Sequence, residues 1–314
     1  MIHTIFMKTN NYYKKTSTTK KIPRLIIVLG IFEIIYICLE ITNNIYINHA
    51  HYVPDYKMIS LDPYASKDAY TESDYKTLFY QTGLSPRAID TLRDKPYYLS
   101  ELKRYQRDFF MDINVKTDSN PFLTRTGYTC DKSGHIISAF NTAPLEDGYI
   151  LYTPSSNTLA WNNGHIAIVT NAANNSIFEA FAPGTKSGLS PDNHWNTYPA
   201  FIMFKVNSSI LSTNPALIPN VINTVNSSLN DLPYNLFAGI LSPKKTEKVE
   251  SSQCAHIIWY AFQANGLDLD YNSGAIVTPS DIADCVLLEV IQIYGVDPDK
   301  FWHKVNCSGI PISK

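Results

Sequence analysis

Residues Ser251–Gly266, with the sequence SSQCAHIIWYAFQANG, decide the fold that we expect for this chain. Ser251 or Ser252 is suited to cap the N-terminus of a helix, and Gly266 is suited to end it in a left-handed conformation. Apolar residues at three- and four-residue spacing lie on the side that carries Cys254, which predicts that this side packs inward. The sequence therefore predicts one helix with a cysteine at the buried edge of its first turn.

A cysteine at a helix start has two interpretations. A helix N-terminus carries roughly half a positive charge and free N–H groups, which favour a thiolate over a thiol. That is the environment of a nucleophile. Alternatively, Cys254 is a small buried hydrophobe, as most lone cysteines are. A partner base elsewhere in the chain would favour the first interpretation.

The chain has 314 residues and a net charge of −2, which suits one sizeable core with an accessory segment. We expect no nucleic-acid partner from this charge. If Cys254 is a nucleophile and Cys38 lies in an apolar segment, Cys130, Cys285 and Cys307 remain. At most one disulfide can form among these three, so the chain is no disulfide scaffold.

The N-terminal segment is basic and then apolar. Lysines and Arg24 precede the apolar run Leu25–Leu39, a pattern typical of a signal anchor. We interpret residues 1–21 as a cytoplasmic tail and 22–42 as a single transmembrane span in the cell membrane, although Glu33 and Glu40 weaken the span. A cleaved signal peptide is the alternative. In either case the rest of the chain is expected outside the cytoplasm.

Residues 43–125 are expected to form a spacer and a helical accessory segment. Three short helices are predicted, beginning at Thr71, at Ser85-Pro86 and at Ser100-Glu101. Nothing in this segment indicates catalysis. It is expected to pack on the main domain, with a role as a lid or a wall-binding surface as the alternative.

The main domain is expected over residues 126–314. Runs with strand periodicity at 148–152, 164–169, 176–181 and 201–206 predict an antiparallel sheet. If Asn171–Ala173 forms the hairpin loop, His165 falls directly opposite Glu179 with Cβ atoms about 5 Å apart. A shift of one residue would put them on opposite faces, so this prediction depends on register.

Further elements are predicted after these strands. Helices are expected from Pro215 to about Leu229 and from Thr278 to about Ile293. Between them, Asp268 and Asp270 alternate with leucines, which predicts an exposed strand edge.

A helix-start cysteine, a strand histidine and a polar residue on the next strand are the parts of a papain-like catalytic site. The thiolate attacks an acyl carbon, the imidazole holds the ion pair, and the third residue fixes the imidazole. Here the order along the chain is His165, Glu179, Cys254, whereas in papain the cysteine comes first. The order is therefore permuted.

Several segments in this order resemble the circularly permuted NlpC-type cysteine hydrolases, and among them the YaeF/YiiX-like branch. The lecithin retinol acyltransferase type is a more distant relative. The resemblance covers about residues 144–285 and leaves out the anchor and the three-helix segment. It is carried by LEDGYIL (145–151), GHIAIV (164–169), FEA (178–180), PYN (233–235), QCAHIIWYAF (253–262), GLDLD (266–270) and TPSD (278–281).

The resemblance implies an α+β fold of the permuted papain-like type, with an antiparallel sheet packed on a catalytic helix. Cys254 would be the nucleophile and His165 the base. Glu179 would be the orienting third residue, with Asp192, Asn193 or a backbone carbonyl as rivals. The backbone N–H of Cys254 is the expected oxyanion donor.

Three further positions bear on this resemblance. Tyr234 either lines the substrate cleft or only packs. The family often has Asp where Tyr149 stands, which should affect only a strand start. It often has Ser where Ala255 stands, which could weaken a contact near the oxyanion site.

We expect no metal and no cofactor. Cys254 and His256 lie in one helix with their side chains about 200° apart, so they do not form a zinc site with Cys285, His303 and Cys307.

The interpretation is a membrane-anchored extracytoplasmic cysteine hydrolase that cleaves an amide bond in a cell-wall peptide. Two alternatives stay open at this point. One is lipid acyl hydrolysis or acyl transfer, which a wide apolar cleft would favour. The other is a catalytically silent wall-binding module.

Overall fold

The computed structural model describes residues 24–49, 51–120, 124–158, 161, 163–190, 192–239 and 242–305. The chain divides into two compact units, of which the first ends at Cys38 and the second begins at Leu39. The second unit holds strands β1 to β9 and all the expected catalytic residues.

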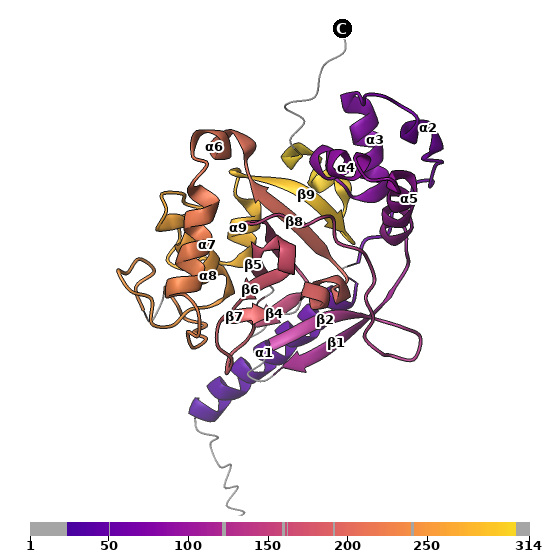
Figure 1. The fold of residues 1–314 in the computed structure, drawn as a ribbon. Coiled ribbons are helices and arrows are strands. Elements are labelled where there is room, and N and C mark those ends of the chain that lie inside the picture. Colours follow the sequence, from indigo (N-terminus) through magenta and orange to yellow (C-terminus); the bar gives the residue numbers. More distant parts are fainter. Residues whose placement is uncertain are drawn as a thin grey trace, which may run out of the picture. The chain divides into compact units, whose positions relative to one another are not determined.

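The main sheet has six strands in the order β7-β6-β5-β3-β8-β9, and each neighbouring pair is antiparallel (Figure 1). Its central strands are buried along almost their whole length. The antiparallel sheet predicted from the sequence is confirmed, and the fold is α+β. The strands are β3 (Ile150–Thr153), β5 (His165–Asn171), β6 (Ser176–Glu179), β7 (Gly188–Ser190), β8 (Phe201–Val206) and β9 (Leu288–Tyr294).

The two faces of the sheet are covered by different helices. Ile166 and Ile168 of β5 belong to a core that includes α8 (Cys254–Gln263), together with α7 (Leu217–Ser228) and α9 (Pro279–Asp284). Ala167 and Val169 alternate with them and belong to a second core built with the N-terminal helices. Because α8 packs on β5, the sheet brings the strand of His165 to the helix of Cys254.

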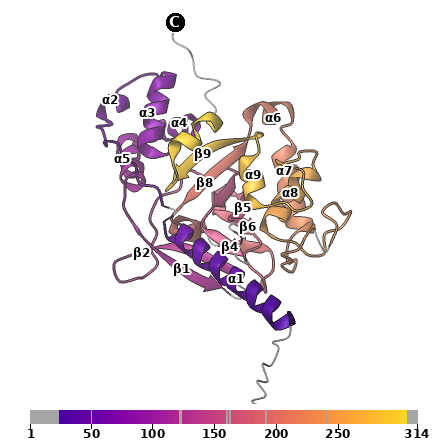
Figure 2. The ribbon, with the colours of Figure 1, turned by 180° about the vertical axis from the view of Figure 1, so that it is seen from behind.

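The N-terminal helices of this unit are α2 (Asp62–Ala65), α3 (Glu72–Thr82), α4 (Pro86–Arg93) and α5 (Tyr98–Phe109), and α4 lies beside β9 (Figures 1 and 2). Thr71 caps α3 through a capping box and Ser85 caps α4, as predicted. The helix predicted from Ser100 begins two residues earlier, at Tyr98, without a side-chain cap.

A small three-stranded sheet was not predicted. It has the order β1-β2-β4, with β1 (Asn114–Asn120), β2 (Thr124–Cys130) and β4 (Ser156–Thr158) paired antiparallel. These strands are rich in Thr, Asn and Ser, so they lack the apolar alternation that indicates a strand. The domain boundary expected after residue 125 falls inside β2.

A strand stands where the sequence predicts the second half of a helix. Thr278 caps α9 with a capping box, as predicted, but α9 ends at Asp284. The prediction of a helix to Ile293 is wrong because Leu288–Tyr294 forms β9, which is buried throughout and pairs with β8. Pairing with β8 satisfies the backbone hydrogen bonds of this strand, and its β-branched side chains pack on both faces of the sheet.

The segment before α9 also differs from its prediction. Asp268 accepts the indole N–H of Trp259 at 2.8 Å, and Asp270 is buried in an ion pair with Lys244. The exposed strand edge expected there is therefore wrong, because residues 267–270 form no strand and Asp270 is buried, although Asp268 is exposed. The helix expected from Pro215 is confirmed as α7, and a further short helix, α6 (Ser208–Thr213), precedes it.

Helix α1 (Arg24–Asn48) is the one described helix long and apolar enough to cross a membrane, from Arg24 to Ile47, although a signal sequence meets the same test. Its last turns belong to the second unit, where Glu40 forms an ion pair with Arg125 at 3.3 Å. Ile47 is fully buried against Gly127, and a Cβ atom at position 127 would clash with the Ile47 side chain. The ion pair with Arg125 explains the presence of Glu40, which from the sequence alone only weakens a membrane span.

Candidate active site

Cys254 is the first residue of α8, as predicted, but the cap before it is Gln253 and not Ser251 or Ser252. The side-chain oxygen of Gln253 accepts the N–H of Ala255 at 2.8 Å, and its amide nitrogen donates to the Val277 carbonyl at 2.6 Å. Glutamine replaces serine because its longer side chain makes both contacts at once. The helix start that carries Cys254 is thereby tied to the loop before α9.

The other predictions for this helix hold. Ile258, Ala261 and Phe262 are buried, and Gly266 has a left-handed φ of 86°. His256 is buried as well, so it is a packing residue. As the first residue of the helix, Cys254 carries an N–H group without an intrahelical acceptor.

His165 and Glu179 lie in contact on the neighbouring strands β5 and β6. The Nε2 atom of His165 is 2.7 Å from Oε2 of Glu179, and both side chains are about 5% exposed. At this distance the ring nitrogen donates a hydrogen bond to the carboxylate. The pair predicted from the sequence is therefore present and buried.

The register that produces this contact differs from the predicted one. The hairpin loop is a 3₁₀ turn, Ala172–Asn174, and pairing resumes at Asn171 opposite Ser176. A bulge near Asn171 adjusts the pairing, and Ile168 opposite Phe178 puts Glu179 across from Ala167 instead of His165. The prediction that His165 and Glu179 are directly opposite is wrong by two residues. A shift of two preserves the face, so the contact forms along a diagonal.

Cys254 is the third member of the group, because its thiol is close enough to raise the pKa of His165. The thiol itself donates a hydrogen bond to Oε1 of Gln253 at 3.6 Å. Because Nε2 faces Glu179, Nδ1 is the ring nitrogen left for the thiol. Burial alone would lower the pKa of His165, but the hydrogen bonds to Cys254 and Glu179 outweigh it and raise this pKa to about 10. The imidazole is therefore held as a cation through neutral pH.

Glu179 stays ionised in the same buried place. Burial raises its pKa, but the contacts with His165, and then the charge of His194, bring it below the ordinary value. Of the rivals for the third position, the side chains of Asp192 and Asn193 lie outside what the structure describes. Glu179 is the carboxylate that contacts the imidazole.

Aromatic side chains that were not predicted fix the plane of the imidazole. Trp195, fully buried in the 3₁₀ segment η2 (Asp192–Thr197), stacks on His165 with ring centroids 5.4 Å apart and planes 14° apart. Phe181 meets the same ring edge-on at 5.5 Å. Since both contacts depend on the folded path between β6 and β8, no local sequence pattern could reveal them.

His194 is a second histidine at this carboxylate, and sequence analysis missed it too. Its Nε2 lies 3.6 Å from Oε1 of Glu179, the oxygen that His165 does not use. Glu179 therefore lies between two imidazoles, one buried and one partly exposed.

Tyr234, expected in the cleft or in packing, lies partly buried against the core that contains Cys254. Burial raises its pKa well above the ordinary value, and the nearby Cys254 raises it further. The phenol is thus neutral and close to Cys254.

Among the described residues, the other cysteines and the side chains that could bind a metal ion do not form a second site. Cys130 and Cys285 are free and buried, and Cys307 lies outside the described residues. In the part of the chain that the structure describes, no group of three or more His, Cys, Asp or Glu side chains is arranged to hold a metal ion.

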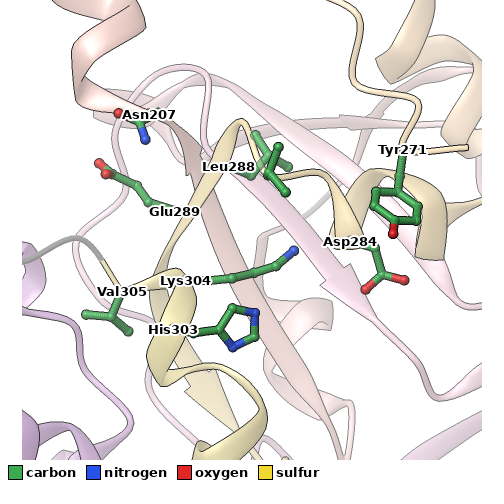
Figure 3. Close-up of a pocket in the computed structure, with 9 residues that line it drawn as sticks. Asn207, Tyr271, Asp284, Leu288, Glu289, His303, Lys304 and Val305 are labelled. Atoms are coloured by element: carbon green, nitrogen blue, oxygen red, sulfur yellow. The ribbon is translucent and has the colours of Figure 1, made fainter.

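Two cavities differ in their relation to the triad. One, of about 570 Å³, is lined by both polar and apolar residues, among them Lys304, His303 and Asp284, but Cys254, His165 and Glu179 do not line it (Figure 3). The other, of about 120 Å³, is lined by Gln253, the residue before Cys254. The smaller cavity therefore lies beside the start of the helix that carries Cys254.

Comparison of the chain with protein-family models, with curated proteins and with solved structures found no match. The function of the site is therefore inferred from its own side chains.

Proposed function

We propose that this protein is a membrane-anchored extracytoplasmic cysteine hydrolase that cleaves an amide bond in a cell-wall peptide. The observation that carries the proposal is the buried His165–Glu179 contact of 2.7 Å, with the Cys254 thiol close enough to raise the pKa of the same imidazole. The substrate class rests on the family resemblance and on the apolar helix α1.

The energetics of the pair favour a catalytic role over a silent binding module. Removing two charges from water costs several kcal/mol for each ion, and their attraction recovers this only with good geometry. A binding module gains nothing from such an arrangement, whereas a nucleophile needs it. Strongly perturbed titratable groups of this kind concentrate at functional sites.

The acylation step uses the thiolate and the imidazolium together. The Cys254 thiolate attacks the carbonyl carbon and forms a C–S bond, and the backbone N–H of Cys254 donates to the developing oxyanion. The His165 imidazolium gives its Nδ1 proton to the amide nitrogen as the C–N bond breaks. The amine leaves, and a thioester remains on Cys254.

The deacylation step restores the site. His165 takes a proton from water, and the resulting hydroxide attacks the thioester carbon. The C–S bond breaks, the carboxylic acid leaves, and the thiolate–imidazolium pair re-forms. The sum is hydrolysis of an amide by one water molecule.

The test uses the full-length protein in detergent with peptides released from purified cell wall. We expect new amino and carboxyl termini by mass spectrometry, together with an acyl adduct on Cys254 after rapid acid quenching. Cys254→Ala should abolish both, with the unfolding temperature as a check on its folding. Cleavage that persists in Cys254→Ala, or wild type that cleaves none of the peptides, would refute the proposal.

A further inference from the structure

The smaller cavity lies where the elements of the catalytic residues begin. Gln253 precedes Cys254 directly, and Asn163 stands two residues before His165. Leu236 stands two residues after Tyr234, which packs against the core that contains Cys254. The cavity therefore lies beside the starts of α8 and β5, the elements that carry Cys254 and His165.

The walls of the cavity are apolar and include aromatic side chains that face solvent. Trp161 is 52% exposed and Phe237 is 42% exposed, although both are large hydrophobic residues. Ile276 and Val277 complete the apolar wall. No charged side chain is among the described residues that line the cavity, so a charged substituent would lose its hydration there without a partner.

One polar atom at the cavity has no internal partner. Oδ1 of Asn163 is buried and accepts no hydrogen bond within the described part of the chain. Gln253, in contrast, already uses both ends of its amide in contacts with Ala255 and Val277. Asn163 is thus the available acceptor for an N–H group of a bound peptide.

The volume limits the size of the bound group. An engineered apolar cavity of about 150 Å³ holds one benzene molecule. A cavity of about 120 Å³ therefore fits a group of roughly four to six carbons, such as a branched aliphatic side chain. A long lipid acyl chain exceeds this volume several-fold.

On the premise of the proposed hydrolase, we infer that this cavity is the subsite for a short aliphatic side chain of the peptide substrate, with Asn163 accepting a backbone N–H beside it. The subsite gives the enzyme a preference for small apolar residues next to the scissile amide. It also sets this protein apart from enzymes that act on long acyl chains.

The experiment compares rates of Cys254 alkylation by chloroacetamides that differ only in the group on nitrogen. The full-length protein in detergent is treated with unsubstituted, N-isobutyl and N-hexadecyl chloroacetamide, and adducts are quantified by mass spectrometry. We expect the isobutyl reagent to react about tenfold faster than the unsubstituted one, since burying such a group is favourable by that order. The hexadecyl reagent should show no further gain.

Two variants locate the effect. Ile276→Trp fills the cavity and should bring the isobutyl preference close to one, whereas Val286→Trp places the same indole at the cavity of about 570 Å³ and should preserve it. Equal rates for the small reagents in wild type, or a clear advantage for the hexadecyl reagent, would overturn the subsite. The proposed nucleophile is judged separately, by whether unsubstituted chloroacetamide still labels Cys254 below neutral pH.

Discussion

Two buried histidines of this protein have opposite charge states. His165 is 4% exposed and His256 is 2% exposed, so burial disfavours the charged form of both. His165 contacts the Glu179 carboxylate and the Cys254 thiol, and its pKa rises to about 10. His256 has its pKa lowered, because burial dominates over its one favourable contact with the Lys244 carbonyl.

The two histidines differ in the charge of their hydrogen-bond partners. Nε2 of His256 donates to the Lys244 carbonyl at 2.9 Å, and Nδ1 accepts from the Ser252 hydroxyl at 2.7 Å. Both partners are neutral, so a neutral ring satisfies them. An ionised partner therefore decides whether a buried histidine is charged. The region around His256 fixes the loop before α8, while the region around His165 supplies reactivity.

The largest effect is expected from Glu179→Gln, which removes the ionised partner. The pKa of His165 should fall toward or below 6.5, and alkylation of Cys254 at pH 5.5 to 6 should slow at least tenfold. Removing one member of a buried ion pair should also lower the free energy of unfolding by about 3 kcal/mol. Rates of labelling and denaturant unfolding measure these two effects.

The same variant gives a pH signature of stability. The raised pKa of His165 stabilises the fold fully below 6.5, and this contribution is lost as the pH rises through about 10. The lowered pKa of Glu179 stabilises it above 4.5, and this contribution is lost on acidification. The difference in unfolding temperature between wild type and Glu179→Gln should therefore peak between about pH 4.5 and 6.5. A difference that does not vary with pH would mean that the pair is not ionised.

A smaller effect is expected from His256→Leu. The substitution removes the imidazole partner of Ser252 and Lys244 and should lower the free energy of unfolding by about 1–3 kcal/mol. The pH profile of Cys254 labelling should keep its shape, because His256 does not carry the charge. A profile that shifts by more than one pH unit would show that the two histidines are not separate in function.

The smallest effect is expected from His194→Gln. Its contact with Glu179 spans 3.6 Å and the ring is partly exposed, so solvent screens it. Loss of its charge should let Glu179 take up a proton slightly earlier on acidification. Labelling of Cys254 should slow two- to threefold near pH 5 and stay unchanged near pH 8. A two- to threefold change corresponds to the free energy of about one surface ion pair. A tenfold change at pH 8 would mean that His194, not His165, governs the thiol.

Local signals predicted much of the site. An apolar stripe and a glycine locate the helix of Cys254, although its cap is Gln253 and not the expected serine, and strand periodicity locates His165 and Glu179. The predicted register missed by two residues because a bulge near Asn171 has no sequence signal, but the even shift kept both side chains on one face.

Features that depend on distant contacts could not be predicted in this way. The run Leu288–Tyr294 is apolar enough for a helix or a buried strand, and only its pairing with β8 decides for the strand. Trp195 stacks on His165 from a segment thirty residues further on, and such a contact exists only in the folded chain.

The pH dependence of Cys254 alkylation tests whether Cys254 and His165 form the proposed thiolate–imidazolium pair. Wild type should label rapidly at pH 6, whereas His165→Ala should label about a hundredfold more slowly there and recover only near pH 8.5, where an ordinary thiol ionises. Slow labelling of wild type at pH 6, with the same profile in His165→Ala, would rule out the ion pair and leave Cys254 as a structural cysteine.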